Sequence, residues 1–124
     1  MTAPSPDHPI TVEPNPHRVT VTFSGRTIAD TTHALALREA RYPAVQYIPR
    51  ADVEMARLTR TAHSTHCPYK GDAAYFSIEV DGRASENAVW TYESPFDRVA
   101  EIKDYLAFYP NRVDAIVEHD TADS

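Results

Sequence analysis

The sequence is poor in cysteine, glycine and long apolar runs: its 124 residues contain one cysteine and three glycines. A single cysteine cannot form an intramolecular disulfide, so we expect a reducing compartment and a cytoplasmic location. No apolar stretch approaches the ~20 residues that a membrane-spanning helix needs, which argues against a membrane partner. No basic segment followed by an apolar run opens the chain, and we expect no signal peptide.

Several classes of chemistry lack their usual parts. The sequence contains no GxGxxG or GxxxxGK[ST] loop and no Asp-x-Asp pair, so magnesium-dependent phosphoryl transfer is not expected. The formal net charge is −6 and the arginines are scattered, whereas nucleic-acid binding needs a basic patch, so no nucleic-acid partner is predicted. One cysteine and scattered histidines do not match a closed zinc site, so neither a metal nor a cofactor is predicted.

Proline is abundant, and its distribution predicts the domain boundaries. Half of the ten prolines fall within the first sixteen residues. Residues 1–9 are therefore predicted to form a disordered Pro-rich arm, and residues 10–13 a strand at a sheet edge. Residues 10–117 are expected to form a single globular domain, and the polar residues 118–124 a flexible tail.

Most of this domain is predicted to be strand. Alternating or β-branched segments predict strands over residues 19–23, 26–30, 44–48, 73–80, 83–92 and 112–117. Asp81-Gly82 predicts a two-residue hairpin turn. A short helix is expected over 52–58. A longer one begins at Ser94, buries Leu106 on its apolar face and ends at Pro110. The order predicts a mainly β (α+β), antiparallel domain with one helix in its C-terminal half.

The segment from His63 to Gly71 is the strongest candidate for a site, because it gathers a nucleophile, a base and a cation. Cys67 is either a nucleophile, with His63 as the better base, or a small buried apolar residue, and the buried interpretation is favoured. Lys70 is one of only two lysines in the chain. It lines a pocket or lies exposed in a turn, and the pocket interpretation is slightly favoured. His66 adds a further potential metal ligand.

Other candidates come from the remaining strands. Trp90 and four tyrosines form either a pocket wall or part of the core; the tyrosines are Tyr47, Tyr69, Tyr75 and Tyr92. Glu86 either pairs with Lys70 or an arginine, acts as a proton acceptor, or simply faces outward. For Arg50 and its neighbour Asp52, a local ion pair or a helix cap is the leading interpretation.

A set of motifs in fixed order gives the chain a family resemblance. The segments are Tyr42-Pro43-x-Val45-x-Tyr47-x-Pro49-Arg50-x-Asp52-Val53, His63, Cys67-Pro68-Tyr69-Lys70-Gly71, Glu86-Asn87-Ala88-Val89-Trp90-x-Tyr92 and Phe108-Tyr109-Pro110. Together they resemble the family called domain of unknown function 427, which also carries a nucleotidyltransferase-like label. The resemblance implies a small β-tent-like fold with a helix near the C-terminus. Tandem copies in that family leave a homodimer open, and the family has no established activity.

The function predicted from these residues is binding of a small, anionic or carbonyl-bearing metabolite. The pocket would surround the Cys67–Gly71 segment and Trp90, with Lys70, Tyr69, Trp90, Tyr47 and Arg50 as ligand-binding residues. The first alternative is an enzyme that uses Cys67 or Lys70 with His63 or Glu86 as acid or base. The second alternative is a dimerising scaffold domain without chemistry.

Overall fold

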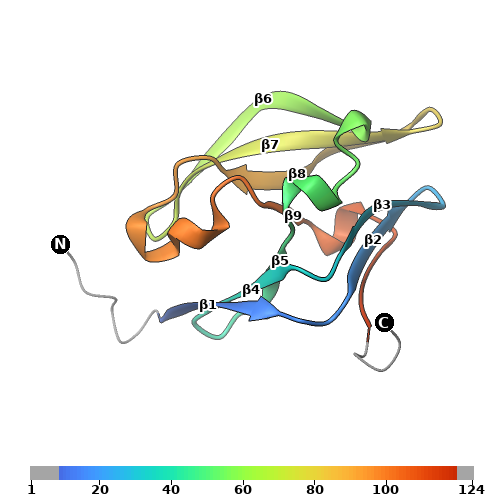
Figure 1. The fold of residues 1–124 in the computed structure, drawn as a ribbon. Helices are drawn as coiled ribbons and strands as arrows, with labels where there is room; N and C mark the ends of the chain where they lie inside the picture. Colours follow the sequence, from blue (N-terminus) through green and yellow to red (C-terminus); the bar gives the residue numbers. More distant parts are fainter. Residues whose placement is uncertain (1–8, 120–124) are drawn as a thin grey trace.

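A computed structural model describes residues 9–119, which form three antiparallel sheets. Figure 1 shows a four-stranded sheet lying above two three-stranded sheets. The four-stranded sheet has the order β6 (Leu58–Cys67), β7 (Gly71–Val80), β8 (Arg83–Tyr92) and β9 (Leu106–Phe108). The second has the order β1 (Ile10–Asn15), β4 (Ala34–Glu39) and β5 (Val45–Tyr47). The third has the order β10 (Ala115–Glu118), β2 (Val19–Phe23) and β3 (Arg26–Thr31).

Backbone hydrogen bonds join two of the sheets and tie β3 to the segment that follows β5. Ile48 follows β5 and exchanges two hydrogen bonds of 2.8 Å with Leu106 of β9, which links the sheet of β1, β4 and β5 to the four-stranded sheet. Val53 forms an isolated bridge with Ala29 of β3. The predicted mainly β, antiparallel class is confirmed. Within residues 9–119, no helix is long and apolar enough to cross a membrane.

The sequence predicted the amphipathic strands and missed the others. The expected strands over 19–23, 26–30, 73–80 and 83–92 are confirmed within a residue or two, and β1 lies at a sheet edge as expected. The prediction missed β4, whose Ala-Leu-Ala-Leu run is apolar without alternation, and β6, which is exposed on both faces along most of its length. It also missed β9, which was assigned to a helix.

The predicted boundaries need correction at the C-terminal end of the domain. The last strand begins at Ala115 rather than Arg112, because Pro110–Arg112 forms the 3-10 turn η4. Glu118 belongs to β10, so the tail predicted over 118–124 begins too early. Of the predicted N-terminal arm, residues 1–8 lie outside the described residues, as do residues 120–124 of the tail.

Both segments predicted to be helical contain helical turns, but these turns are much shorter than the predicted helices. The segment after Ser94 forms only the 3-10 helix η3 (Asp97–Ile102), preceded by Phe96 and without a side-chain cap. Val99 has φ −128°, which interrupts the helix, and Leu106 pairs with β8 as part of β9. The apolar residues whose spacing predicted one helix therefore belong to two different elements, η3 and β9. The expected helix over 52–58 is two 3-10 turns, η1 (Arg50–Asp52) and η2 (Met55–Arg57).

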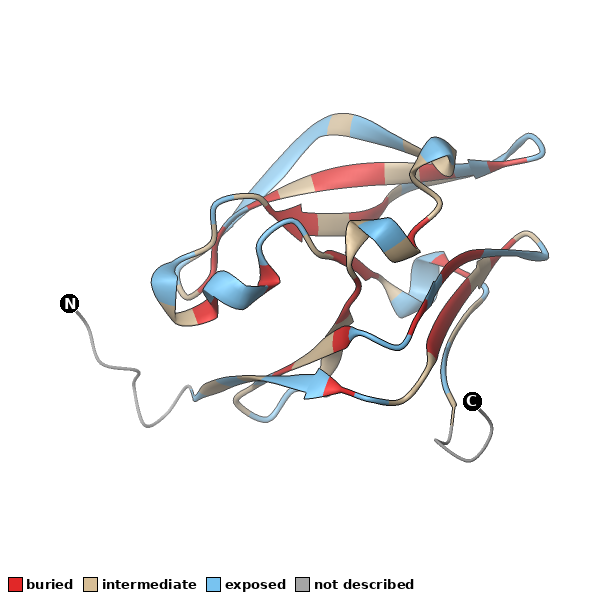
Figure 2. Cartoon of the chain, viewed as in Figure 1, coloured by how far each residue is buried: buried red, intermediate tan, exposed pale blue. Residues whose placement is uncertain are grey.

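Buried side chains form two clusters between the sheets, and Figure 2 shows the buried residues on strands of all three sheets. The larger cluster joins β2 and β3 to the middle of β7 and β8, and it includes Val21, Ile78 and Leu106. The smaller cluster is rich in aromatic residues and joins β4 and β5 to the first half of β7 and the last residues of β8. It contains Tyr47 and Tyr92, and it surrounds the cavity described below.

A surface ion-pair group ties β3 to η2 and should make stability depend on pH. Arg26 and Arg57 both donate to the Glu54 carboxylate, and the hydrogen bonds from Arg26 hold the pKa of Glu54 at about 2, below its ordinary 4.5. Because the pKa is lowered in the folded state, this stabilisation is complete above pH ~4.5 and is lost as the pH falls towards ~2. Urea unfolding between about pH 6 and about pH 2.5 should show a smaller loss for Glu54→Gln than for the unmodified protein. Equal losses would contradict this assignment.

Candidate functional site

A cavity of about 260 Å3 lies between the sheet of β1, β4 and β5 and the four-stranded sheet. Strands β4, β5, β7 and β8 supply most of the wall, and the loop before β5 supplies Tyr42, which is 68% exposed. The lining residues are mostly aromatic or apolar: Leu37, Glu39, Tyr42, Pro43, Val45, Tyr47, Lys70, Tyr75, Trp90, Tyr92 and Tyr109.

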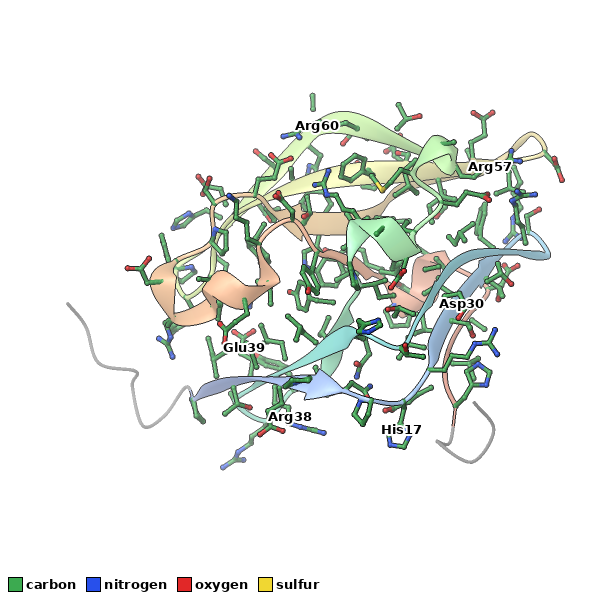
Figure 3. All side chains as sticks on the ribbon, in the orientation of Figure 1. His17, Asp30, Arg38, Glu39, Arg57 and Arg60 are labelled. Carbon is green, nitrogen blue, oxygen red and sulfur yellow. The ribbon has the colours of Figure 1, made fainter. Side chains whose placement is uncertain are left out.

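Lys70 lines this cavity and is buried, with 8% of its surface exposed. Its ammonium forms a salt bridge with the carboxylate of Glu39, the last residue of β4. Figure 3 labels Glu39 next to Arg38, whose side chain extends away from the molecule, as expected for adjacent strand residues. The suggested pairing of Lys70 with Glu86 is therefore wrong, and so is the picture of Lys70 as a solvated lysine.

The backbone on both sides of Lys70 fixes the direction of its side chain. Lys70 follows β6 in the turn before β7, where its N–H donates to the carbonyl of Cys67 at 3.3 Å. Its own carbonyl accepts from the N–H of Phe96 at 3.0 Å. Gly71 has φ +116°, and an added Cβ would lie 3.3 Å from the carbonyl oxygen of Ser94. The turn therefore needs glycine both for its conformation and for its close approach to the segment before η3.

Gly71→Ala should destabilise the protein by more than ~1 kcal/mol, because alanine is strained at positive φ and its Cβ would crowd Ser94. Gly25→Ala is a matched control, since Gly25 also has positive φ but has nothing within 4 Å of an added Cβ. Urea unfolding would measure both. A Gly71 variant no less stable than the Gly25 variant would contradict the role given to the close contact.

The aromatic side chains of the wall contact one another through ring faces and hydroxyls. Trp90 donates its Nε1 hydrogen to the Tyr47 hydroxyl at 3.2 Å, and its ring centroid lies 4.5 Å from that of Tyr109. The Tyr109 and Tyr75 hydroxyls lie 3.2 Å apart, with the two rings nearly parallel. Thr65 of β6 lies 2.9 Å from the Tyr75 hydroxyl. These contacts hold the wall in a defined shape.

Burial keeps the wall tyrosines protonated. It raises the pKa of Tyr47 and of Tyr92 well above the ordinary value near 10. Burial, with a contribution from the hydrogen bond to Tyr75, raises the pKa of Tyr109 to about 12. At neutral pH these side chains present neutral hydroxyls and ring faces. Among the residues that line the cavity, the ionised side chains are accordingly Lys70 and Glu39.

Two of the predicted ligand-binding residues lie elsewhere. Tyr69 is half-buried in the turn before Lys70 and is not part of the cavity wall. Arg50 donates to the backbone carbonyl of Asp104 at 2.8 Å and lies 3.6 Å from the Glu93 carboxylate. The expected local pair of Arg50 with Asp52 is therefore wrong, because Asp52 accepts a hydrogen bond from the Thr31 hydroxyl at 2.6 Å instead.

The residues considered for catalysis are dispersed. Cys67 is half-buried and packs against the aromatic cluster, in keeping with its interpretation as a small apolar residue. His63 lies four residues earlier on β6, roughly 13 Å away along an extended strand, and its ring packs on Tyr75. Glu86 is exposed on β8. His66 is exposed and lies 2.6 Å from the Asp72 carboxylate. Over residues 9–119, no three His, Cys, Asp or Glu side chains gather in a group that would hold a metal ion.

The structure adds residues that the sequence argument did not select, chiefly Glu39 and Tyr109. A signal was present for Tyr109, which belongs to the Phe108-Tyr109-Pro110 motif. Most other wall residues also belong to the motifs of the family resemblance, including Tyr42, Val45 and Tyr92. Glu39 carried no such signal, because its strand was not predicted and its partner is 31 positions away.

The fold and the cavity define a small, mainly β domain with an aromatic pocket containing one ion pair. The chain belongs to the family described as Domain of unknown function (DUF427), whose model matches residues 11–119. The nucleotidyltransferase label attached to that family is a name and establishes no activity. No curated protein matches the chain.

Proposed function

We propose that this protein is a small-molecule-binding domain and that its ligand occupies the aromatic cavity. The observation that carries this proposal is the position of Lys70, a buried charged side chain aimed into a cavity whose other walls are mainly tyrosine, tryptophan and aliphatic residues. Apolar walls with a few converging polar groups are the usual composition of small-molecule sites. An aromatic core needs neither a cavity nor an ion pair inside it.

The sequence motifs support the same assignment. Wall residues come from four separate motif segments, represented by Tyr42, Lys70, Trp90 and Tyr109, and the fold brings these segments together around one space. The larger cluster also contributes Val53, Ala88, Val89 and Phe108 to the motifs, so the support comes from the convergence of the four segments on one cavity.

Native mass spectrometry of the full chain, purified without denaturation, provides the first test. We expect an added mass that disappears when the protein is unfolded. A parallel screen of small metabolites can use Trp90 as its probe, because it is the only tryptophan in the chain and forms part of the wall. A ligand that binds in the cavity should change its fluorescence.

Two tyrosine variants provide the control for location. Tyr109 and Tyr105 are both half-buried and pack against the aromatic cluster, but only Tyr109 lines the cavity. Tyr109→Ala should weaken binding, measured by calorimetry, about tenfold or more, whereas Tyr105→Ala should leave it nearly unchanged. A protein with no bound mass and no hit in the screen would overturn the proposal, as would a ligand equally sensitive to both variants.

A further inference from the structure

We propose that the ligand of the aromatic cavity is a small zwitterion, a molecule that carries both an ammonium group and a carboxylate. This inference rests on the proposed function and specifies its ligand class. The observation behind it is the Lys70–Glu39 pair, whose side chains are 10% and 17% exposed and both face the cavity. The pair makes the wall neutral overall while placing a positive and a negative group side by side.

A ligand with only one charge fits this pair poorly. An anion that reaches the Lys70 ammonium must also come close to the Glu39 carboxylate, because these two groups are in direct contact. In a poorly solvated site the repulsion between the two negative groups is only weakly screened. The same argument applies to a lone cation, which meets the Lys70 ammonium as it reaches Glu39. The simple anion expected from the sequence is therefore disfavoured.

A zwitterion satisfies both charges at once. Its carboxylate can accept hydrogen bonds from Lys70 while its ammonium faces Glu39, so each buried charge keeps an opposite neighbour and the occupied site remains neutral. Buried charges are tolerated in proteins when they are paired in this way. The ligand then supplements the ion pair instead of competing for one half of it.

The aromatic wall strengthens the cationic side of the site. Trp90 and Tyr109 lie with ring centroids 4.5 Å apart and 43° between their planes, and Tyr47 meets Trp90 edge-on. Ring faces attract ammonium groups, and methylated ammonium groups above all, because the faces carry partial negative charge. The cavity of about 260 Å3 limits the ligand to a small molecule. An ammonium among the rings and a carboxylate on Lys70 use the features of this wall together.

Three probes of nearly equal shape separate these possibilities. Glycine betaine carries both charges, 3,3-dimethylbutanoate replaces its nitrogen with carbon and is an anion, and choline keeps the trimethylammonium group without the carboxylate. Calorimetry and Trp90 fluorescence on the full chain should show that betaine, or a small amino acid tested beside it, binds about tenfold or more tighter than either singly charged probe.

Charge variants test which residue contacts which end. Glu39→Gln should shift the preference towards 3,3-dimethylbutanoate, and Lys70→Met should shift it towards choline. Lys103→Met is the matched control, since Lys103 is exposed, and it should leave the order of affinities unchanged. Circular dichroism would establish that each variant is folded. Folded charge variants that keep the original order of affinities would overturn the inference.

The remaining outcomes separate this inference from the proposed function. If 3,3-dimethylbutanoate or choline binds as tightly as the zwitterions, the zwitterion inference fails while ligand binding in the cavity stands. The same holds if every probe and amino acid fails but a metabolite that is not a zwitterion binds with the Tyr109 dependence described above. If nothing in the complete screen binds, the proposed function fails as well.

Discussion

Replacing Leu106 with alanine is expected to lower the free energy of unfolding by about 2–5 kcal/mol, the range measured when a fully buried leucine is truncated. Leu106 is completely buried in the larger cluster, and its backbone exchanges two hydrogen bonds with Ile48. Removing its side chain therefore leaves a void next to the joint between two sheets. Urea unfolding followed by circular dichroism would measure the loss.

Leu58→Ala is the matched control for this prediction. Leu58 is the first residue of β6 and is only partly buried against the same cluster. The same change of side chain should therefore cost less, because less apolar surface was removed from water. A Leu106 variant as stable as the Leu58 variant would show that the junction of β5 and β9 is packed differently.

Lys70→Ala should destabilise the protein by about 2–4 kcal/mol, because it removes the ammonium from beside a carboxylate that is largely out of solvent. A lysine exposed in a turn would contribute little to stability, whereas Lys70 is buried. Lys103→Ala, at the other lysine of the chain, should change stability by less than ~0.5 kcal/mol because Lys103 is exposed. Thermal or urea unfolding of the two variants gives a direct comparison.

The double variant Lys70→Met with Glu39→Gln tests the cause of this effect. It removes both charges while keeping side chains of similar length, and replacing a buried pair as a unit is often neutral for stability. The double variant should therefore be more stable than Lys70→Met alone, which keeps the side-chain length but leaves the Glu39 carboxylate beside an apolar side chain. If the two variants are equally stable, the loss does not come from electrostatics.

The sequence predicted the fold best where local pattern and tertiary environment agree. Strand β2 alternates apolar residues with threonine, and β7 buries alternate side chains along most of its length, so both strands can be recognised from their sequence patterns. Strand β6 lies at the edge of the four-stranded sheet with most of both faces exposed, and no alternation marks it. The helix after Ser94 failed for a related reason. Val99, Ile102 and Leu106 are all buried, as their spacing predicts. However, Val99 and Ile102 belong to η3, whereas Leu106 belongs to β9.

The candidate site was partly predictable for a different reason. Lys70 stood out because lysine is rare in this chain, and Trp90 because it is the only tryptophan. Glu39 could not be found this way, since its role depends on β4 packing opposite the turn before β7. An ion pair between distant segments leaves no trace in local spacing. Tyr69 and Arg50 are the opposite case. They lie close in sequence to other selected residues, but the fold does not place them in the cavity wall.

The junction of Ile48 and Leu106 has a consequence for how the cavity opens. Its two backbone hydrogen bonds fasten β5 to β9, and the neighbouring residues Tyr47 and Ala107 both belong to the aromatic cluster. The two walls are therefore hinged at this end and cannot separate there without breaking the joint. If the cavity takes up a ligand as proposed, we expect the entrance on the side of Tyr42, which lines the cavity and is 68% exposed, and not at this joint.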